Sequence, residues 1–241
     1  MNDYYSAISG SAAMAPFIDR YEPRQIVQFS AELSKLGCAQ IYDAAPNYCH
    51  PLPAFLTSRG TARTLAGPVF PVSTLNDMLP LLQALDQAPP GWVLYVRNVA
   101  PESEALAGDI FMSAMRSQGL SGLVVDGAVR DIGSFDATTP PVFSRSVTFV
   151  SAKTAKAPAG ETPTTLDYGA YRIEPGDYVV GDADGLLLIK QQYLTAVIVG
   201  ARHLLAKEFE LKERLESGRR LGDLIGLSAF LQGNGPLKFE V

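Results

Sequence analysis

Arg130 and Asp131 are adjacent residues whose side chains can together bind a small acid and a divalent metal ion. A guanidinium group offers a planar pair of donors that matches a carboxylate, and an aspartate is a hard oxygen ligand suited to Mg²⁺ or Mn²⁺. The pair follows the apolar run 122–126, which we expect to be a buried strand ending at its acid. Ligand sites of α/β folds often lie just beyond the carboxyl ends of strands. An ordinary surface ion pair is the alternative interpretation.

A second acidic residue, Asp109, opens a helix that we expect over 108–118. The first amides of a helix have no partner within it, so those of Ile110 and Phe111 are free to hold an anion close to Gly108. Asp109 itself suits the positive end of the helix dipole, and an ordinary acid at a helix start is the alternative interpretation of this residue.

The composition excludes several classes of protein. The chain has 241 residues, a net charge of −5 and 47% hydrophobic residues, which suits one compact domain. Its acidity argues against a nucleic-acid ligand, because phosphate binding needs a concentrated basic face. No apolar run approaches the roughly 18 residues of a membrane span, and the N-terminus lacks a signal-peptide pattern. We therefore expect no membrane partner.

Histidine and cysteine offer little for catalysis. His50 and His203 are the only histidines, so we expect neither a catalytic triad nor a histidine-rich metal site, and we expect His203 to pack within a helix. Cys38 and Cys49 form no metal-binding pair and no disulfide framework. This use of cysteine fits a reducing, cytoplasmic location.

The elements that must position these residues alternate between helix and strand. Apolar spacing predicts helices over 24–36, 75–85, 108–118 and 193–217. Short apolar runs predict strands over 60–66, 92–96, 122–126, 141–143 and 147–150. The block 171–190 has the pattern of two strands around a turn, and 151–169 is expected to be a loop. Such mixing without an internal repeat indicates one α/β domain.

Five segments of the chain resemble a known family. The segment DGAVRD at 126–131, with GD upstream at 108–109, closely resembles the 4-hydroxy-4-methyl-2-oxoglutarate aldolase family. That family also includes 4-carboxy-4-hydroxy-2-oxoadipate aldolases and regulators of ribonuclease E activity. The similarity extends across roughly residues 30–220 through LSKLGCAQIYDA at 33–44, GTARTL at 60–65 and PGDYVVGDADGLLLI at 175–189.

The resemblance implies a fold and an assembly. The fold is a single swivelling-type α/β/β sandwich domain followed by C-terminal helices. We expect an N-terminal arm over 1–23, the aldolase-like domain over 24–220 and a C-terminal extension over 221–241. The family assembles as homotrimers or hexamers, and its active sites lie between subunits.

The resemblance also implies roles for single residues. Asp131 matches the family's metal ligand, and Arg130 matches the arginine that binds the pyruvyl carboxylate. The stretch 108–111 matches the backbone amides that bind the same carboxylate, and Asp109 matches an acid that holds metal-bound water. Glu208, supplied by the C-terminal helix of a neighbouring subunit, is the best match for a glutamate that completes the site.

The assignment of that glutamate has rivals on the same predicted helix. Glu210 and Glu213 also match, and each of these glutamates has the ordinary alternative of a solvated helix face. On such a face, glutamates pair with cations four residues away. The helix therefore carries several acids, of which one is expected to reach the site of a neighbouring subunit.

The activity implied is that of a divalent-metal-dependent aldolase. A 4-hydroxy-2-oxo acid, such as 4-hydroxy-4-methyl-2-oxoglutarate or 4-carboxy-4-hydroxy-2-oxoadipate, would be cleaved to pyruvate and a second oxo acid with Mg²⁺ or Mn²⁺. Oxaloacetate decarboxylation would accompany cleavage through the same stabilised enolate. Two alternatives stay open: a non-catalytic regulator that binds a protein partner, and a related lyase or decarboxylase acting on another oxo acid.

Overall fold

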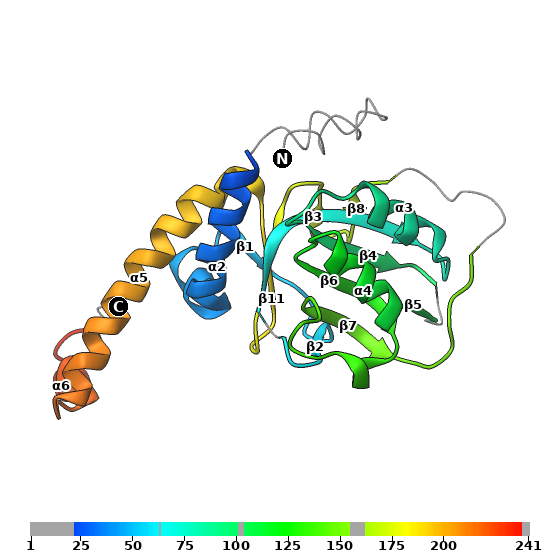
Figure 1. The fold of residues 1–241 in the computed structure, drawn as a ribbon. Coiled ribbons are helices and arrows are strands. Elements are labelled where there is room, and N and C mark those ends of the chain that lie inside the picture. The colour runs from blue at the N-terminus through cyan, green and yellow to red at the C-terminus, as the bar shows by residue number, and fades with distance from the viewer. Residues whose placement is uncertain (1–21, 63, 101–103, 155–161, 238–241) are drawn as a thin grey trace.

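The computed structural model describes residues 22–62, 64–100, 104–154 and 162–237. Its helices are α2 (Pro23–Ala44), α3 (Leu79–Gln87), α4 (Asp109–Ser117), α5 (Leu194–Glu216), α6 (Leu221–Leu224) and α7 (Leu227–Leu231), with 3₁₀ turns η1 (Ile132–Ser134) and η2 (Gln191–Tyr193). One sheet contains β1 (Cys49–Pro51), β2 (Thr57–Arg59), β3 (Leu65–Thr74), β4 (Val93–Asn98), β5 (Ala105–Ala107), β6 (Gly122–Val129), β7 (Val142–Val147), β10 (Tyr178–Gly181) and β11 (Leu186–Ile189). Strands β8 (Leu166–Asp167) and β9 (Arg172–Ile173) form a separate pair. The predicted α/β fold with C-terminal helices is confirmed (Figure 1).

Strand β3 belongs to two parts of the sheet. Its residues 65–68 pair antiparallel with β10, whereas residues 69–74 pair parallel with β4. The strand order is β1-β11-β10-β3-β4-β6-β7-β2, with β5 attached to β6. The prediction of a strand over 60–66 is wrong for residues 60–64. Gly60 bends the chain with a φ of 81°, and the strand begins only at Leu65.

Helices α3 and α4 cover one face of the parallel strands (Figure 1). Phe70, Leu94 and Leu123 point from β3, β4 and β6 into this core, which also contains Trp92. Trp92 is the only tryptophan of the chain, is 2% exposed, and has its ring 6.3 Å from that of Phe70. The strands are nearly continuous apolar runs because both of their faces are buried.

The opposite face of the parallel strands is covered by antiparallel strands. Tyr95, Val124 and Phe143 share a core with Val179 and Leu188, which belong to β10 and β11. The outer side of β10 and β11 packs on α2 and α5 through a third core. The predicted α/β/β sandwich therefore carries a further helical layer on its outer side.

Helix α2 is longer than the predicted helix 24–36 and bends at Gly37. Gly37 adopts a φ of 77°, which glycine accepts without steric cost, and the chain then continues as helix to Ala44. The backbone N–H of Cys38 donates to Asp182 Oδ2 at 2.7 Å. This bond ties the bend to the turn between β10 and β11, where the sequence predicts a turn.

Helix α5 agrees closely with the predicted helix 193–217. Its first half packs on α2, and its second half extends past the sheet and leads to α6 and α7 (Figure 1). Val197, Ile198 and Ala201 define its packed face. His203 lies off that face and is exposed, so the prediction that it packs within the helix is wrong.

Two further predicted boundaries differ from the structure. Helix α3 begins at Leu79, four residues later than the predicted helix 75–85, because residues 75–78 form the bend that leads into the helix. The strand predicted over 141–143 is part of the longer strand β7, whose polar residues after Phe143 an apolar count does not detect. The strand predicted over 147–150 is wrong, because only Val147 belongs to β7 and residues 148–150 lie outside any strand.

Parts of three predicted segments lie outside the described residues. Of the predicted arm over 1–23, only the last two residues are described. Residues 155–161 of the predicted loop 151–169 and residues 238–241 of the predicted C-terminal extension are not described. The described part of that loop includes β8. Within the described ranges, no helix combines the length and apolarity needed to cross a bilayer.

Strand β6 continues through Asp126 to Val129, so this acid lies inside the strand. The prediction that the strand ends at Asp126 is therefore wrong. Asp126 is 3% exposed. Its Oδ1 accepts a hydrogen bond from Arg145 Nε at 2.7 Å, and its Oδ2 accepts one from the Tyr168 hydroxyl at 3.0 Å. A buried carboxylate needs such partners, and both come from distant parts of the chain.

A stack of four side chains holds the β8–β9 pair over this face. The Arg97 guanidinium lies 4.2 Å from the Tyr168 ring centroid, and the Tyr168 and Tyr171 rings are 4.8 Å apart and nearly parallel. His50 continues the stack 4.2 Å from Tyr171. Burial raises the pKa of Tyr171 to about 12, so its hydroxyl stays neutral within this cation–π and aromatic stack.

Candidate active site

Strands β5 and β6 place the two halves of the predicted site side by side. They pair in parallel, with Ala107 opposite Val129, and the N–H of Arg130 donates to the carbonyl of Ala107 at 2.9 Å. Both strands end here, so Gly108 and Arg130 leave the sheet from neighbouring positions. Backbone pairing thus closes the long sequence separation between them.

Gly108 lies directly against the side chains of Arg130 and Asp131. A Cβ atom on Gly108 would lie 2.4 Å from Asp131 Oδ2, 2.9 Å from Arg130 Cγ and 3.2 Å from Arg130 Nε. These distances are shorter than normal van der Waals contact, so a side chain at 108 would displace both groups. The φ of −150° is open to any residue, and steric room is therefore the reason for glycine.

Arg130 and Asp131 form an ion pair, with 3.2 Å between Nε and Oδ2, and their side chains are 39% and 40% exposed. Asp131 adopts the left-handed conformation, with φ 58° and ψ 27°, which aspartate tolerates better than most residues. Its carbonyl accepts hydrogen bonds from the N–H of Ser134 at 3.0 Å and from the Ser134 hydroxyl at 2.7 Å. These bonds hold the turn that directs the carboxylate back toward Arg130.

Helix α4 begins at Asp109, and Gly108 precedes its first turn. Asp109 Oδ1 accepts a hydrogen bond from the N–H of Ile110 at 2.7 Å, so the expectation that both first amides are free is wrong for Ile110. No described residue accepts a hydrogen bond from the N–H of Phe111. An anion at this helix end would bind the Phe111 amide and compete with Asp109 for that of Ile110.

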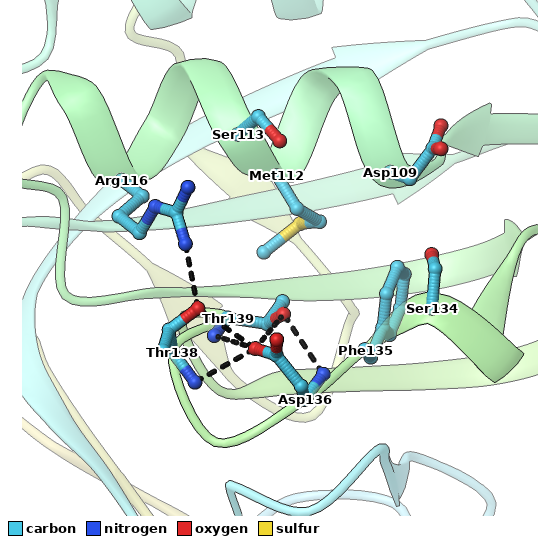
Figure 2. A pocket seen from close by; sticks show the side chains of 9 residues that line it. All are labelled: Asp109, Met112, Ser113, Arg116, Ser134, Phe135, Asp136, Thr138 and Thr139. Carbon is cyan, nitrogen blue, oxygen red and sulfur yellow. Dashed lines mark hydrogen bonds between the residues drawn. The ribbon is translucent and has the colours of Figure 1, made fainter.

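Two cavities flank α4. One, of about 210 Å³, is lined by Gly108, Arg130 and the first turn of α4, with Leu82 and Leu85 of α3 as an apolar wall. The other, of about 250 Å³, lies between α4 and the segment after η1, and Figure 2 shows its lining side chains. Asp109 lines both cavities. The predicted residues at 108–111 and Arg130 thus share one hollow.

The sequence of the chain is similar to a known protein family. A sequence model of the RraA-like family, described as aldolase/RraA, matches residues 38–188. The chain belongs to the RraA-like family. A protein of Halalkalibacterium halodurans, provisionally named 4-hydroxy-4-methyl-2-oxoglutarate aldolase, is 32% identical to it over 169 residues, which are 70% of this chain and 77% of that protein.

Solved structures of similar proteins carry different names. One titled S-adenosylmethionine:2-dimethylmenaquinone methyltransferase, from Geobacillus kaustophilus, superposes with a TM-score of 0.59 at 30% identity, covering 65% of this chain and 96% of that one. A Thermus protein titled the RNA-processing inhibitor RraA superposes with a TM-score of 0.57 at 26% identity, covering 63% and 90%. The RraA-like family therefore includes both aldolases and regulators, and the site must decide between them.

In this RraA-like protein, Glu208 is distant from the Arg130–Asp131 pair of its own chain. Its Oε2 accepts a hydrogen bond from Gln40 Nε2 at 3.2 Å and lies 3.9 Å from Lys212 Nζ. Helix α5 packs on the outer side of β10 and β11, whereas α4 packs on the far side of the parallel strands (Figure 1). Within one chain, the β layers separate this glutamate from the pair.

The two cysteines of this RraA-like chain are not activated. Burial raises the pKa of Cys49 to about 11, and burial also raises the pKa of Cys38. Both thiols stay protonated at neutral pH, so neither is an activated nucleophile. In the described part of the chain, no three His, Cys, Asp or Glu side chains gather as a ready metal site.

Sequence reasoning missed Arg116, which lines the second cavity. Asp109, Met112, Ser113 and Arg116 recur at the spacing of one helix face, and all four line that cavity. This spacing was readable in the sequence of α4. The opposite wall was not, because its position depends on how β7 and η1 pack.

Proposed function

We propose that this protein is a divalent-metal-dependent aldolase that cleaves a 4-hydroxy-2-oxo acid into pyruvate and a second oxo acid. The observation that carries the proposal is the arrangement at Gly108. The paired side chains of Arg130 and Asp131 pack against the backbone of this glycine, beside an open cavity. Similarity to the Halalkalibacterium protein supports the same class of reaction. Substrates of this class include 4-hydroxy-4-methyl-2-oxoglutarate and 4-carboxy-4-hydroxy-2-oxoadipate.

The donor set suits Mg²⁺ or Mn²⁺. Asp131 and Asp109 supply hard carboxylate oxygens, and Mg²⁺ commonly binds through one or two carboxylates while it keeps several waters. Zinc instead favours three or four nitrogen and sulfur ligands, which the described residues do not gather. We assign Asp131 as the direct ligand and Asp109 as a ligand through water. When bound, the ion would supply Lewis-acid stabilisation of negative charge at the 2-keto oxygen.

The groups of the chain itself would bind and orient the substrate. Arg130 presents paired donors to the C1 carboxylate, and the N–H of Phe111 adds a donor at the positive end of α4. This anchoring holds C2 and C3 beside Asp131. When the C4 hydroxyl gives its proton to water in the site, the C3–C4 bond breaks and the second oxo acid leaves, and a proton returned from water to C3 gives pyruvate. Fixed positioning of this kind lowers the barrier to cleavage.

Pyruvate release by the purified protein tests the proposal. We expect release from both 4-hydroxy-4-methyl-2-oxoglutarate and oxaloacetate, because aldol cleavage and decarboxylation leave the same carbanion at C3. A dehydrogenase-coupled assay measures both. Treatment with EDTA should lower each rate by about 100-fold or more, and added Mg²⁺ should restore it.

The Asp131→Ala protein is the matched control, and it should stay inactive when Mg²⁺ is restored. Decarboxylation without aldol cleavage would move the substrate to another oxo acid. If folded wild-type protein released no pyruvate from either compound, the proposal would fail. The similarity to the Thermus inhibitor would then favour a partner-binding role.

We also propose that the site is shared between copies of the chain in a homotrimer or hexamer. Leu82 and Ile110 line the cavity beside Arg130, yet they are 43% and 78% exposed. Phe149, two residues before Ser151 of the cavity wall, is 90% exposed. Apolar side chains gathered in this way indicate an interface. Glu208, which is separated from its own chain's pair, would then complete the site of a neighbouring copy.

Mixing two inactive variants tests this sharing. The Asp131→Ala and Glu208→Gln proteins should each be inactive alone. Co-expressed in equal amounts, they should regain about a quarter of wild-type activity, because each site draws the two residues from two different chains at random. A Glu210→Gln protein should be active alone. An active Glu208→Gln protein, or a mixture that stays inactive, would contradict the shared site.

A further inference from the structure

The second cavity contains a cationic side chain that no step of the proposed reaction uses. Asp109, Met112, Ser113 and Arg116 form its α4 wall, and the segment after η1 forms the opposite wall (Figure 2). The α4 wall runs from the first turn of the helix to its last. Asp109 also lines the cavity beside Arg130, and Ser134, which donates to the Asp131 carbonyl, lines the second cavity, so the second cavity lies close to the proposed site.

Arg116 is positioned by one hydrogen bond and keeps most of its donors. Its Nη1 donates to Thr138 Oγ1 at 2.6 Å (Figure 2). Among the described residues it forms no other hydrogen bond through its side chain and no ion pair. A guanidinium has five N–H donors in a rigid fork, so the remaining ones match a carboxylate that enters the cavity.

The acid on the opposite wall, Asp136, is engaged by its own turn. Asp136 Oδ1 accepts hydrogen bonds from the N–H and the hydroxyl of Thr138, each at 2.8 Å, and from the N–H of Thr139 at 3.2 Å. The bonds from Thr138 hold the pKa of Asp136 below its usual value. Asp136 therefore fixes Thr138, which in turn fixes Arg116, without pairing directly with the guanidinium.

We infer that Arg116 binds the second carboxylate, which the proposed substrates carry beyond the cleaved bond, and that Arg116 thereby determines the preference for diacids over monoacids. The inference rests on the proposed function, which anchors the first carboxylate at Arg130 and Phe111. Arg116 lies seven residues after Asp109, which is about 10 Å along the helix axis. Long helical side chains lean toward the N-terminus of their helix, so the Arg116 side chain extends back along the cavity wall toward Asp109. A diacid of five or six carbons suits the distance that remains between the two carboxylate-binding ends.

Binding of two unreactive probes tests the inference apart from turnover. 2-Oxoadipate and 2-oxohexanoate have the same chain length, and only the first has a distal carboxylate. Calorimetry on the full-length protein with saturating Mg²⁺ should show 2-oxoadipate bound about tenfold tighter or more, since a charge-assisted Arg–carboxylate contact is worth at least that much.

Variants of Arg116 locate the effect. Arg116→Gln should bring the two affinities within about twofold of each other, leave 2-oxohexanoate binding unchanged, and leave the melting temperature close to wild type because the side chain is exposed. Arg116→Lys should keep part of the preference, because it keeps the charge and loses the fork. Arg219→Gln removes an exposed charge outside the cavity and should keep the full preference.

The outcomes separate this inference from the proposed function. Equal binding of the two probes by wild type, no binding of either, or an unchanged preference in Arg116→Gln would overturn the inference, even if pyruvate release confirmed an aldolase. An Arg116-dependent preference for the diacid in a protein that releases no pyruvate would support the subsite and reject the reaction.

Discussion

Replacing Gly108 with alanine is expected to lower kcat/KM for pyruvate release by about 100-fold or more while the protein stays folded. The added Cβ would lie 2.4 Å from Asp131 Oδ2 and 2.9 Å from Arg130 Cγ, so both side chains must move. They are partly exposed and can swing outward without disturbing the core. Displacement of binding groups by about 1 Å can cost two orders of magnitude in rate.

A matched control exists a few residues away. Gly133 lies in η1, and a Cβ added there would meet nothing within 4 Å. Gly133→Ala should therefore keep near-normal kcat/KM, and both variants should show wild-type thermal melting. A Gly108→Ala enzyme with normal kinetics would show that Arg130 and Asp131 do not need their observed positions.

Replacing Arg145 with alanine is expected to lower the free energy of unfolding by about 3 kcal/mol, the largest stability effect we predict for a charged residue. The change leaves the Asp126 carboxylate, 3% exposed, with the Tyr168 hydroxyl as its remaining hydrogen-bond partner among the described residues. Arg145 also covers the Phe55 ring at 4.1 Å, and that contact is lost as well. Removal of one partner from a buried pair costs more than the pair itself contributes, because a charge is left without compensation.

The pair formed by Arg172 and Asp167 provides the comparison. Its side chains are 66% and 51% exposed, so Arg172→Ala should cost less than about 1 kcal/mol. Urea unfolding at one fixed protein concentration measures both variants, since the proposed assembly would make stability depend on concentration. Equal losses for the two variants would contradict the view that burial of Asp126 decides the cost.

The elements of the fold were largely predictable because their patterns are local. The spacing of apolar residues was enough for α5 and for the buried part of β4, where one face or both are covered. The errors arose where distant partners decide the structure. Strand β6 continues through Asp126 because Arg145 and Tyr168 compensate the buried charge, and α2 continues past Gly37 because Asp182 holds the Cys38 amide.

The site was predictable in its residues more than in its geometry. The motifs GD and DGAVRD identified Gly108, Arg130 and Asp131 as candidate residues, but the contact between these residues depends on the pairing of β5 with β6. The occupied amide of Ile110 could not be foreseen, because a side-chain rotamer of Asp109 sets it. The proposed role of Glu208 depends on a neighbouring copy of the chain, so neither the sequence nor the structure of one chain tests it.

Trp92 gives this protein one internal fluorophore in the layer that supports the site. The indole is 2% exposed, lies in the core under α3 and α4, and its Nε1 finds no acceptor among the described residues. Its emission is therefore that of an apolar environment, and it shifts to longer wavelength only when that core opens to water. That low exposure belongs to a single chain, so the indole stays buried when a neighbouring copy is lost. Loss of a neighbouring copy would therefore leave the emission unchanged, and the spectrum separates disassembly from unfolding without any label.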